Sequence, residues 1–287
     1  MDLALGTAQW GSGYGLTNTR GRLSDDEVAA IIATARDLGI VAVDTHRTSK
    51  PEQGYGAAQS RLRPWAREFA ITTKVFGGAA ADLSIIEQLR ASLSELGIDE
   101  LEGCLIHDWY ELSEAQAVAA ASALEQAKAL GLVRSVGVSA YSVLDVERAV
   151  EIFANLGAVQ VPASVLDQRF VAAPVMASAH AAGVRVQVRS VLLQGLLLEP
   201  ELDSPLAAHP DVIRFHESCA LWGRTALEAC LSFIRSVPWV DHVIVGVTSA
   251  QELSEIGRAW AADDLSVDWS ALASQDADLV DPRRWKR

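Results

Sequence analysis

The sequence is poor in cysteine and contains no apolar run long enough to cross a membrane. Its three cysteines are odd in number and show no C-x-x-C spacing, so neither a disulfide framework nor a thiolate metal site is indicated. The start of the chain, MDLALGTAQW, lacks the basic and long apolar regions of a signal peptide. The longest aliphatic stretch, residues 191–198, is short and interrupted. We therefore expect a cytoplasmic protein with reduced thiols and no membrane partner.

Positive charge is also scarce in this chain. Lys and Arg number 24 against 37 Asp and Glu, which gives a formal net charge of −13. A polyanion would be repelled by such a surface, so we expect no nucleic-acid partner. A small anionic ligand needs only a local site and stays compatible with this charge. The six histidines show no metal-ligand spacing, so we expect no metal site either.

No G-x-G-x-x-G turn joins a predicted strand to a helix, so a Rossmann domain has no support. Interdomain linkers and low-complexity tracts are absent too. The chain instead alternates short apolar runs with amphipathic stretches almost from end to end. The runs that we predict to be strands are residues 3–5, 40–43, 70–73, 103–106, 135–138, 158–161, 185–188 and 242–245.

Helical patterns fill the spaces between these strands. Ser24 followed by Asp25, Asp26 and Glu27 is typical of a helix N-terminus. A glycine stops the helix and an apolar strand follows in five places, at Gly39, Gly97, Gly131, Gly157 and Gly183. The predicted helices are residues 25–38, 83–96, 113–130, 144–156, 174–182, 211–237 and 250–262.

About eight strand–helix units without a large insertion favour a closed barrel over an open sheet. A (β/α)₈ barrel, or TIM barrel, routinely reaches the length of this chain as one unit. We therefore predict a single barrel domain over residues 1–287.

In such a barrel the reactive groups stand at the carboxyl ends of the strands. Three adjacent predicted strands end in Asp44, Lys74 and His107, and Tyr55 lies on the second loop. A lysine cation lowers the pKa of a nearby phenol from about 10, and an aspartate holds the lysine in place. A histidine can hydrogen-bond a carbonyl oxygen, so the group suits protonation of a carbonyl as hydride reaches its carbon.

Short motifs in a fixed order now identify a family. They are Leu5-Gly6-Thr7-Ala8-Gln9, Val43-Asp44-Thr45, Tyr55-Gly56, Thr73-Lys74, Leu105-Ile106-His107, Ser135-Val136-Gly137-Val138-Ser139, Gln160-Val161-Pro162, Arg189-Ser190-Val191-Leu192-Leu193-Gln194-Gly195-Leu196-Leu197 and Val243-Ile244-Val245-Gly246-Val247. Each is weak alone, but the series covers nearly the whole length. The chain resembles the aldo-keto reductases, in particular the bacterial branch that opens with L-G-T-A-Q.

The resemblance implies an oxidoreductase that reduces an aldehyde or ketone, or oxidises the alcohol, with NAD(P)H. The catalytic residues would be Asp44, Tyr55, Lys74 and His107. Ser139 and Gln160 would hold the nicotinamide carboxamide, and Arg189 would lie beside its ring. The full set of implied cofactor contacts is Gly6, Thr7, Ser139, Gln160, Arg189, Ser190, Gly246 and Ser249.

Aromatic and basic residues near the strand ends complete the predicted site. Trp10, Trp109 and Tyr110 follow the first and fourth strands, so we expect them to wall the substrate pocket together with Arg47. Tyr55 comes six residues later than the family spacing, which falls on Ser49. The intervening insertion brings His46, Arg47 and Lys50 to the mouth of the site.

The cofactor motifs depart from the family as well. Ala140 stands where asparagine is usual, and Ile256 where an adenine-binding asparagine is frequent. Glu252 replaces a common arginine, and a carboxylate there would repel a 2′-phosphate, so NADH is expected to be favoured over NADPH. These departures leave open an alternative: a cofactor-independent lyase, isomerase or cyclase that uses Lys74, His107 and Asp44.

Overall fold

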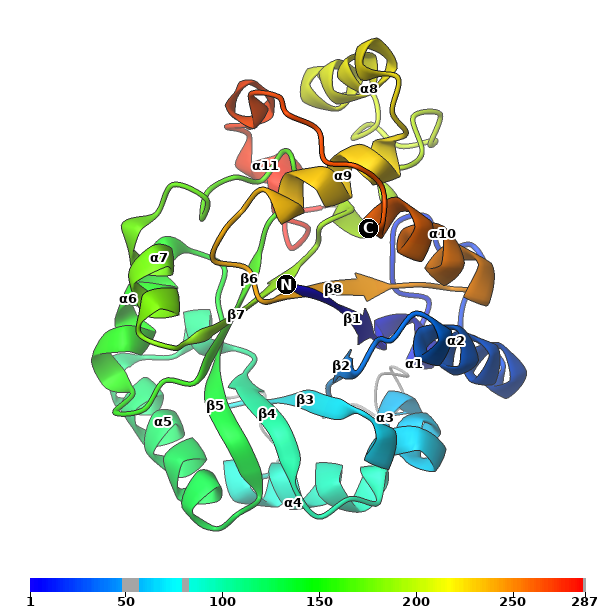
Figure 1. The fold of residues 1–287 in the computed structure, drawn as a ribbon. Coiled ribbons are helices and arrows are strands. Elements are labelled where there is room, and N and C mark those ends of the chain that lie inside the picture. The colour runs from blue at the N-terminus through cyan, green and yellow to red at the C-terminus, as the bar shows by residue number, and fades with distance from the viewer. Residues whose placement is uncertain (48–56, 79–82, 286–287) are drawn as a thin grey trace.

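The computed structural model describes residues 1–47, 57–78 and 83–285. Eight parallel strands close into a barrel in sequence order, and β1 pairs with β8 to complete the ring (Figure 1). The predicted (β/α)₈ architecture is therefore confirmed. The strands are β1 Asp2–Gly6, β2 Ala42–Asp44, β3 Ala70–Val75, β4 Leu101–Ile106, β5 Val133–Ser139, β6 Ala158–Pro162, β7 Arg185–Arg189 and β8 His242–Gly246.

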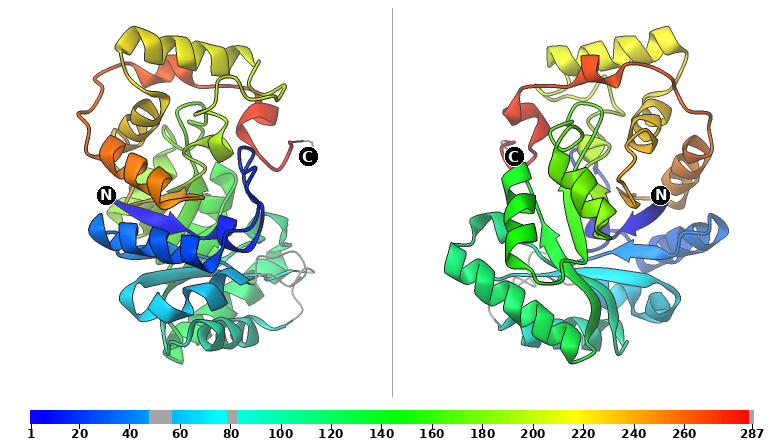
Figure 2. Two further views of the ribbon diagram at one scale, coloured as in Figure 1. Left: turned by 90° about the vertical axis from the view of Figure 1, so that its right-hand side faces the viewer. Right: turned by 60° about the vertical axis from the view of Figure 1, so that its left-hand side comes forward.

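Helices surround the barrel, and α8 lies outermost, beyond α9 (Figures 1 and 2). The α-helices are α1 Ala8–Gly11, α2 Asp25–Asp37, α3 Ala57–Leu62, α4 Ile85–Leu96, α5 Glu114–Ala129, α6 Val143–Ile152, α7 Pro174–Ala181, α8 Pro210–Trp222, α9 Ala226–Arg235, α10 Ala250–Trp260 and α11 Ala277–Val280. Short 3₁₀ turns are η2 Arg63–Glu68, η3 Trp109–Glu111, η4 Leu193–Gly195 and η5 Trp269–Leu272. None of the helices within the described ranges has the length and apolar character that crossing a bilayer requires.

The prediction of one helix over residues 211–237 is wrong. Two helices occupy this stretch, because Gly223 takes a left-handed conformation with φ 63° and ends α8. Thr225 then caps α9, and its side chain accepts from the backbone N–H of Glu228. A glycine C-cap followed by a capping box is a complete stop-and-start signal in the sequence.

The glycine stops are confirmed at four of the five positions, and Gly157 is the exception. Positive φ values occur at the other four, which are Gly39, Gly97, Gly131 and Gly183. Helix α6 instead ends at Ile152. Gly157 is a glycine because its backbone lies close to the side chain of Ser135. A Cβ at Gly157 would lie 2.4 Å from the Ser135 hydroxyl oxygen. The prediction of a helix reaching residue 156 is wrong, because the backbone of Phe153 is already extended, with φ −78° and ψ 127°.

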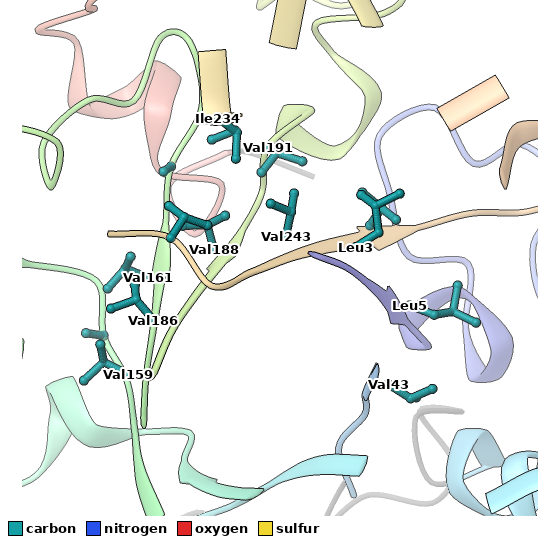
Figure 3. Packing of buried hydrophobic residues seen from close by; sticks show 14 of the residues in the cluster. Leu3, Leu5, Val43, Val159, Val161, Val186, Val188, Val191, Ile234 and Val243 are labelled. Carbon is teal, nitrogen blue, oxygen red and sulfur yellow. The ribbon is translucent and has the colours of Figure 1, made fainter. Parts of the chain in front are cut away.

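Residues along each strand alternate between two environments. One set packs in the hydrophobic layer under the helices, and Figure 3 shows members such as Leu5, Val43, Val186 and Val243. The other set faces the barrel axis, where the register aligns Gly6 with Asp44 on neighbouring strands. The polar side chains of Asp44, Lys74 and Gln160 belong to this axial set. The three cysteines are buried free thiols, in agreement with the sequence analysis.

Candidate active site

A cavity of about 1100 Å³ opens at the carboxyl ends of the strands. Its floor contains Asp44, Lys74 and His107, from three adjacent strands or the turns after them. The structure therefore brings three of the four predicted catalytic residues to one place. Tyr55, the fourth, lies outside the described residues, as do Ser49 and Lys50.

Asp44 and Lys74 form a buried ion pair on this floor. The ammonium nitrogen Nζ of Lys74 lies 2.6 Å and 2.7 Å from the two carboxylate oxygens of Asp44. The Lys74 side chain is 6% exposed. Burial lowers the pKa of Lys74 below its usual value, while the Asp44 charge acts in the opposite direction. The carboxylate thus favours the charged form of a lysine at a site that otherwise disfavours charge.

A chain of amide side chains holds Asp44 from the other side of the barrel. Gln160 Nε2 donates to Asp44 Oδ1 at 2.8 Å and to Gln187 Oε1 at 3.1 Å. Gln187 Nε2 in turn donates to the Thr72 hydroxyl at 3.3 Å. Both donors of Gln160 face acceptors, so its amide orientation is fixed. The chain crosses the barrel from β6 and β7 to β3 and sets the carboxylate in position.

Two histidines lie side by side next to the ion pair. The ring centroids of His46 and His107 are 5.8 Å apart, and His107 stacks on Phe76 at 5.1 Å. Burial lowers the pKa of His46 to about 4, and the Lys74 charge acts in the same direction. Burial, then His46, Lys74 and Arg189, hold the pKa of His107 well below its usual value. Both imidazoles are therefore neutral at neutral pH.

Seven of the eight predicted cofactor residues line the same cavity. Thr7 ties the ends of β1 and β2 together, because its hydroxyl donates to the Thr45 hydroxyl at 2.9 Å. Ser249 is the exception, since its side chain caps α10 by accepting from Glu252 N at 3.1 Å. The lining residues of the predicted set are Gly6, Thr7, Ser139, Gln160, Arg189, Ser190 and Gly246.

Arg189 stacks its guanidinium on the Tyr141 ring at 4.1 Å and donates to the Ala140 carbonyl at 3.1 Å. It pairs with no acidic side chain among the described residues. The loop after it is strained, with positive φ at Ser190, Leu193 and Gln194. Two of these strained residues, Ser190 and Gln194, line the cavity, where a ligand would contact the backbone.

Two buried amide oxygens in the cavity lining lack a protein partner, and that of Gln160 fits a nicotinamide carboxamide. Gln160 Oε1 and Gln9 Oε1 have no hydrogen-bond partner in the structure, although both residues line the cavity. A buried acceptor without a partner is costly, so a ligand N–H donor beside Gln160 Oε1 would remove that cost. Gly246 packs closely against Gln9, because a Cβ at Gly246 would lie 2.5 Å from Gln9 Oε1. The residues present therefore suit the group that the resemblance implies.

The predicted aromatic wall is wrong for the two tryptophans. Trp10 and Trp109 are fully buried in the core, and neither lines the cavity. Each lies in a short helical turn that follows its strand, α1 for Trp10 and η3 for Trp109, which rotates the side chain away from the barrel mouth. The Trp109 indole N–H donates to the Asp145 carbonyl at 2.9 Å, as befits a packed core residue.

Tyr110 and Arg47 also lie away from the cavity wall. Tyr110 meets Tyr141 edge-on with ring centroids 4.9 Å apart, and burial raises its pKa to about 12. Arg47 pairs with Glu95 of α4 at 3.5 Å. Neither belongs to the cavity lining, so their assignment to the pocket is corrected too.

Other side chains take the places of these residues in the wall. His46, which was expected at the mouth of the site, lines the cavity together with Phe76 and Tyr141, which were not predicted. Each comes two residues after an axial strand residue, namely Asp44, Lys74 and Ser139. The alternation of the strand thus continues past its last hydrogen bond, and this spacing is the sequence signal that would find them.

Known proteins share both the sequence pattern and the fold. A model of the Aldo/keto reductase family matches residues 2–272. The methylglyoxal reductase DkgB of Salmonella typhimurium is 31% identical over 190 residues, which cover 65% of this chain and 70% of that protein. An aldo-keto reductase of Mycolicibacterium vanbaalenii is 34% identical over 119 residues, or 42% of each chain.

Solved structures give the same barrel. The aldo-keto reductase AKR11C1 from Bacillus halodurans, in its holo form, superimposes with a TM-score of 0.74 at 18% identity, covering 99% of this chain and 95% of that one. A putative aldo-keto reductase from Pseudomonas aeruginosa gives a TM-score of 0.67 at 22% identity, with 90% and 89% covered. At these identities the likeness concerns the fold. With a family match over nearly its whole length, this chain belongs to the aldo/keto reductase family.

Proposed function

We propose that this carbonyl oxidoreductase uses NAD(P)H to reduce a small aldehyde or ketone, or NAD(P)⁺ to oxidise the corresponding alcohol. The observation that carries the proposal is the buried Asp44–Lys74 pair beside His107, on the floor of a cavity that continues past Gly6 and Gly246. A charged lysine is kept there only at a cost, and its use in acid–base chemistry is the reason to keep it.

Each residue on the floor has a distinct role in this proposal. Lys74 lowers the pKa of the acid that protonates the carbonyl oxygen, and that acid is Tyr55 by resemblance to the family. Asp44 keeps Lys74 charged and in place. His107 is neutral, so it donates one ring N–H to the carbonyl oxygen without competing for the proton.

The nicotinamide would be held at Ser139 and Gln160, where it supplies or accepts the hydride. Gln160 Oε1 accepts from the carboxamide in this arrangement, because both of its N–H groups already face acceptors. Ser139, the last residue of β5, lines the cavity next to Gln160 on the neighbouring strand. Arg189 lines the same cavity and is fixed by its stacking on Tyr141, and by resemblance to the family it would lie beside the ring.

We also propose that NADH binds more tightly than NADPH. Glu252 lines the far end of the cavity, and its carboxylate accepts from Thr248 N at 2.7 Å and from the Thr248 hydroxyl at 2.6 Å. This carboxylate covers the N-terminus of α10, where an adenosine 2′-phosphate would otherwise find backbone donors. Arg258 also lines the cavity, and its positive charge would attract a 2′-phosphate and so reduce the preference for NADH.

Fluorescence titration with NADH and NADPH tests the cofactor proposal directly. We expect micromolar binding of at least one dinucleotide, with NADH tighter. The Glu252→Gln variant should shift the ratio of the two affinities toward NADPH, by roughly tenfold for one removed charge contact. Glu147→Gln, the same change on the exposed side of α6, is the control. Absence of binding by both dinucleotides would overturn the reductase proposal.

Turnover of short aldehydes tests the chemistry. The methylglyoxal reductases among the relatives make methylglyoxal a reasonable first substrate to assay. The Lys74→Met variant should lose at least a hundredfold in kcat while it still binds the dinucleotide, because it removes acid–base assistance. Equal kcat in Lys74→Met and the parent protein would show that the pair plays no part in the reaction.

A further inference from the structure

Tyr141 connects the wall of the cavity with the C-terminal segment of the chain, which the proposed mechanism does not use. Its ring lines the cavity, and the guanidinium carbon of Arg283 lies 3.6 Å from the ring centroid. The guanidinium carbon of Arg189 lies 4.1 Å from the same centroid. Two guanidinium groups so close to one centroid would overlap on a single face, so they occupy opposite faces of the ring. Arg189 lines the cavity and Arg283 does not, so Arg283 supports the ring from behind.

The segment that carries Arg283 is anchored at the carboxyl end of the barrel. Figure 2 shows α11 at the end opposite the N-terminus, where β1 starts. Leu279 and Val280 of this helix are buried. The carboxylate of the buried Asp281 accepts from Arg283 Nε at 2.9 Å, and the Arg283 guanidinium also lies over the Tyr110 ring at 4.6 Å. These contacts place the Arg283 guanidinium before any ligand binds.

Contacts on three sides set the direction of the Tyr141 ring. The backbone N–H of Tyr141 donates to Asp145 Oδ2 at 2.9 Å, which fixes the main chain. The ring itself is held between the two arginines, and the Tyr110 ring meets it edge-on. Its π face attracts each guanidinium. A loss of the support behind the ring would therefore let the side chain turn about a fixed backbone.

Arg189 depends on the direction of this ring in turn. The stacking on Tyr141 and a hydrogen bond to the Ala140 carbonyl at 3.1 Å hold its guanidinium. Ala140 and Tyr141 are consecutive residues, so both contacts belong to the same turn after β5. Movement of the Tyr141 ring would remove one of the two contacts and leave the arginine free to swing out of the wall.

We propose that Arg283 is a positioning residue, which holds Arg189 in the cavity wall through the Tyr141 ring and so strengthens the binding of the nicotinamide dinucleotide. This inference rests on the proposed reductase function, in which Arg189 lies beside the nicotinamide ring. Arg283 touches no ligand in this arrangement and acts only through the stack.

A double-mutant cycle tests the inference, with the dissociation constant of the tighter-bound dinucleotide measured by fluorescence titration. Arg283→Met removes the planar cation and should raise this constant roughly fivefold, the usual effect of losing one cation–π contact. In an Arg189→Met background the same change should have no further effect, because the side chain that Arg283 positions is gone. A fivefold rise in both backgrounds would overturn the proposal, since Arg283 would then act independently of Arg189.

Attraction of the anionic dinucleotide by the charge of Arg283 is the competing explanation. Arg283→Lys keeps the charge but loses the planar group that stacks, so it should bind as weakly as Arg283→Met. An Arg283→Lys variant with the affinity of the parent would overturn the proposal in favour of charge. Arg284→Met is the control, because Arg284 is the next residue and pairs with Asp278 at 2.9 Å on the surface.

Arg283→Met leaves the buried Asp281 carboxylate without its counter-charge, which destabilises the fold. Asp281→Asn/Arg283→Met removes both charges and should show the same fivefold rise, so it replaces the single variant in the cycle if that variant does not fold. Parent-like affinity in this double variant would overturn the positioning role while the reductase function stands. Absence of dinucleotide binding by the parent protein would overturn the reductase function, and the inference with it.

Discussion

Lys74 shows how a single buried charge connects stability with chemistry. Its ammonium group has lost almost all contact with water, and Asp44 supplies the opposing charge through two short contacts. Removing one partner of such a pair leaves an uncompensated charge, which costs more than the pair itself contributes. The Asp44 carboxylate therefore offsets the free-energy cost of burying the Lys74 charge. Gln160 holds this carboxylate in position through a hydrogen bond.

We predict that Asp44→Asn lowers the free energy of unfolding by about 3 kcal/mol, because Lys74 stays buried without its counter-charge. Urea denaturation at pH 7 measures the loss. The double variant Asp44→Asn/Lys74→Met should recover much of it, since no charge is then left in the pocket. A double variant as unstable as the single one would mean that packing, and not charge, explains the effect.

His46 gives the protein a sensitivity to moderate acid. The unfolded chain takes up a proton near pH 6.5, whereas burial delays protonation of folded His46 until about pH 4. Between these values the unfolded state binds more protons, so the free energy of unfolding falls as the pH decreases. His107 acts in the same direction.

The His46→Gln variant should therefore show a shallower fall in stability between pH 6.5 and pH 4, by at most about 1.4 kcal/mol per pH unit. Urea denaturation of both proteins at several pH values gives the two slopes, and acidic side chains that titrate in the same range cancel in the comparison. Identical slopes would show that His46 is protonated equally in both states.

At the scale of elements, the ends of helices decide the architecture as much as their apolar faces. Ser24, Ser84, Ser113 and Thr225 each form a capping box at a helix start. Gly223 ends α8 with a left-handed conformation, and nothing lies within 4 Å of a Cβ placed there. The space is open, so only the backbone conformation requires glycine at this position.

We predict that Gly223→Ala lowers the free energy of unfolding by about 1 kcal/mol, the usual cost of a left-handed alanine. Gly223→Asn should cost less, because asparagine tolerates this conformation. Thermal unfolding of the three proteins gives the order. If alanine and asparagine proved equally harmful, backbone conformation would not be the reason for glycine here.

The strands were predictable because one face of each is consistently apolar, and their ends differ from the prediction by at most two residues. Asp44, Lys74 and His107 were predicted to be neighbours because they follow three adjacent strands at their carboxyl ends. Trp10 and Trp109 were misplaced, because a helical turn after a strand redirects side chains in a way that strand alternation cannot show. Residues 211–237 were misread because apolar periodicity outweighed the signal of Gly223 and Thr225.

At the scale of the whole molecule, the formal net charge of −13 opposes the approach of any anionic ligand. Screening by salt weakens this repulsion, since the Debye length falls from about 30 Å at 0.01 M to about 8 Å at 0.15 M. The association rate of NADH should thus rise, roughly twofold or more, between these salt concentrations. Stopped-flow fluorescence measures the rate. A rate that falls with salt would mean that cations of the cavity wall, such as Arg258, outweigh the total charge.

The pairing of β1 with β8 has a consequence for the order in which the protein is made. Synthesis runs from the N-terminus, so β1 must wait until residues 242–246 have been made before its second neighbour exists. The far end of the cavity, built from residues 244–259, leaves the ribosome in the same late interval. A nascent chain that has not reached these residues therefore lacks one wall of the cavity, and a ligand can stabilise only a barrel in which β8 is paired with β1.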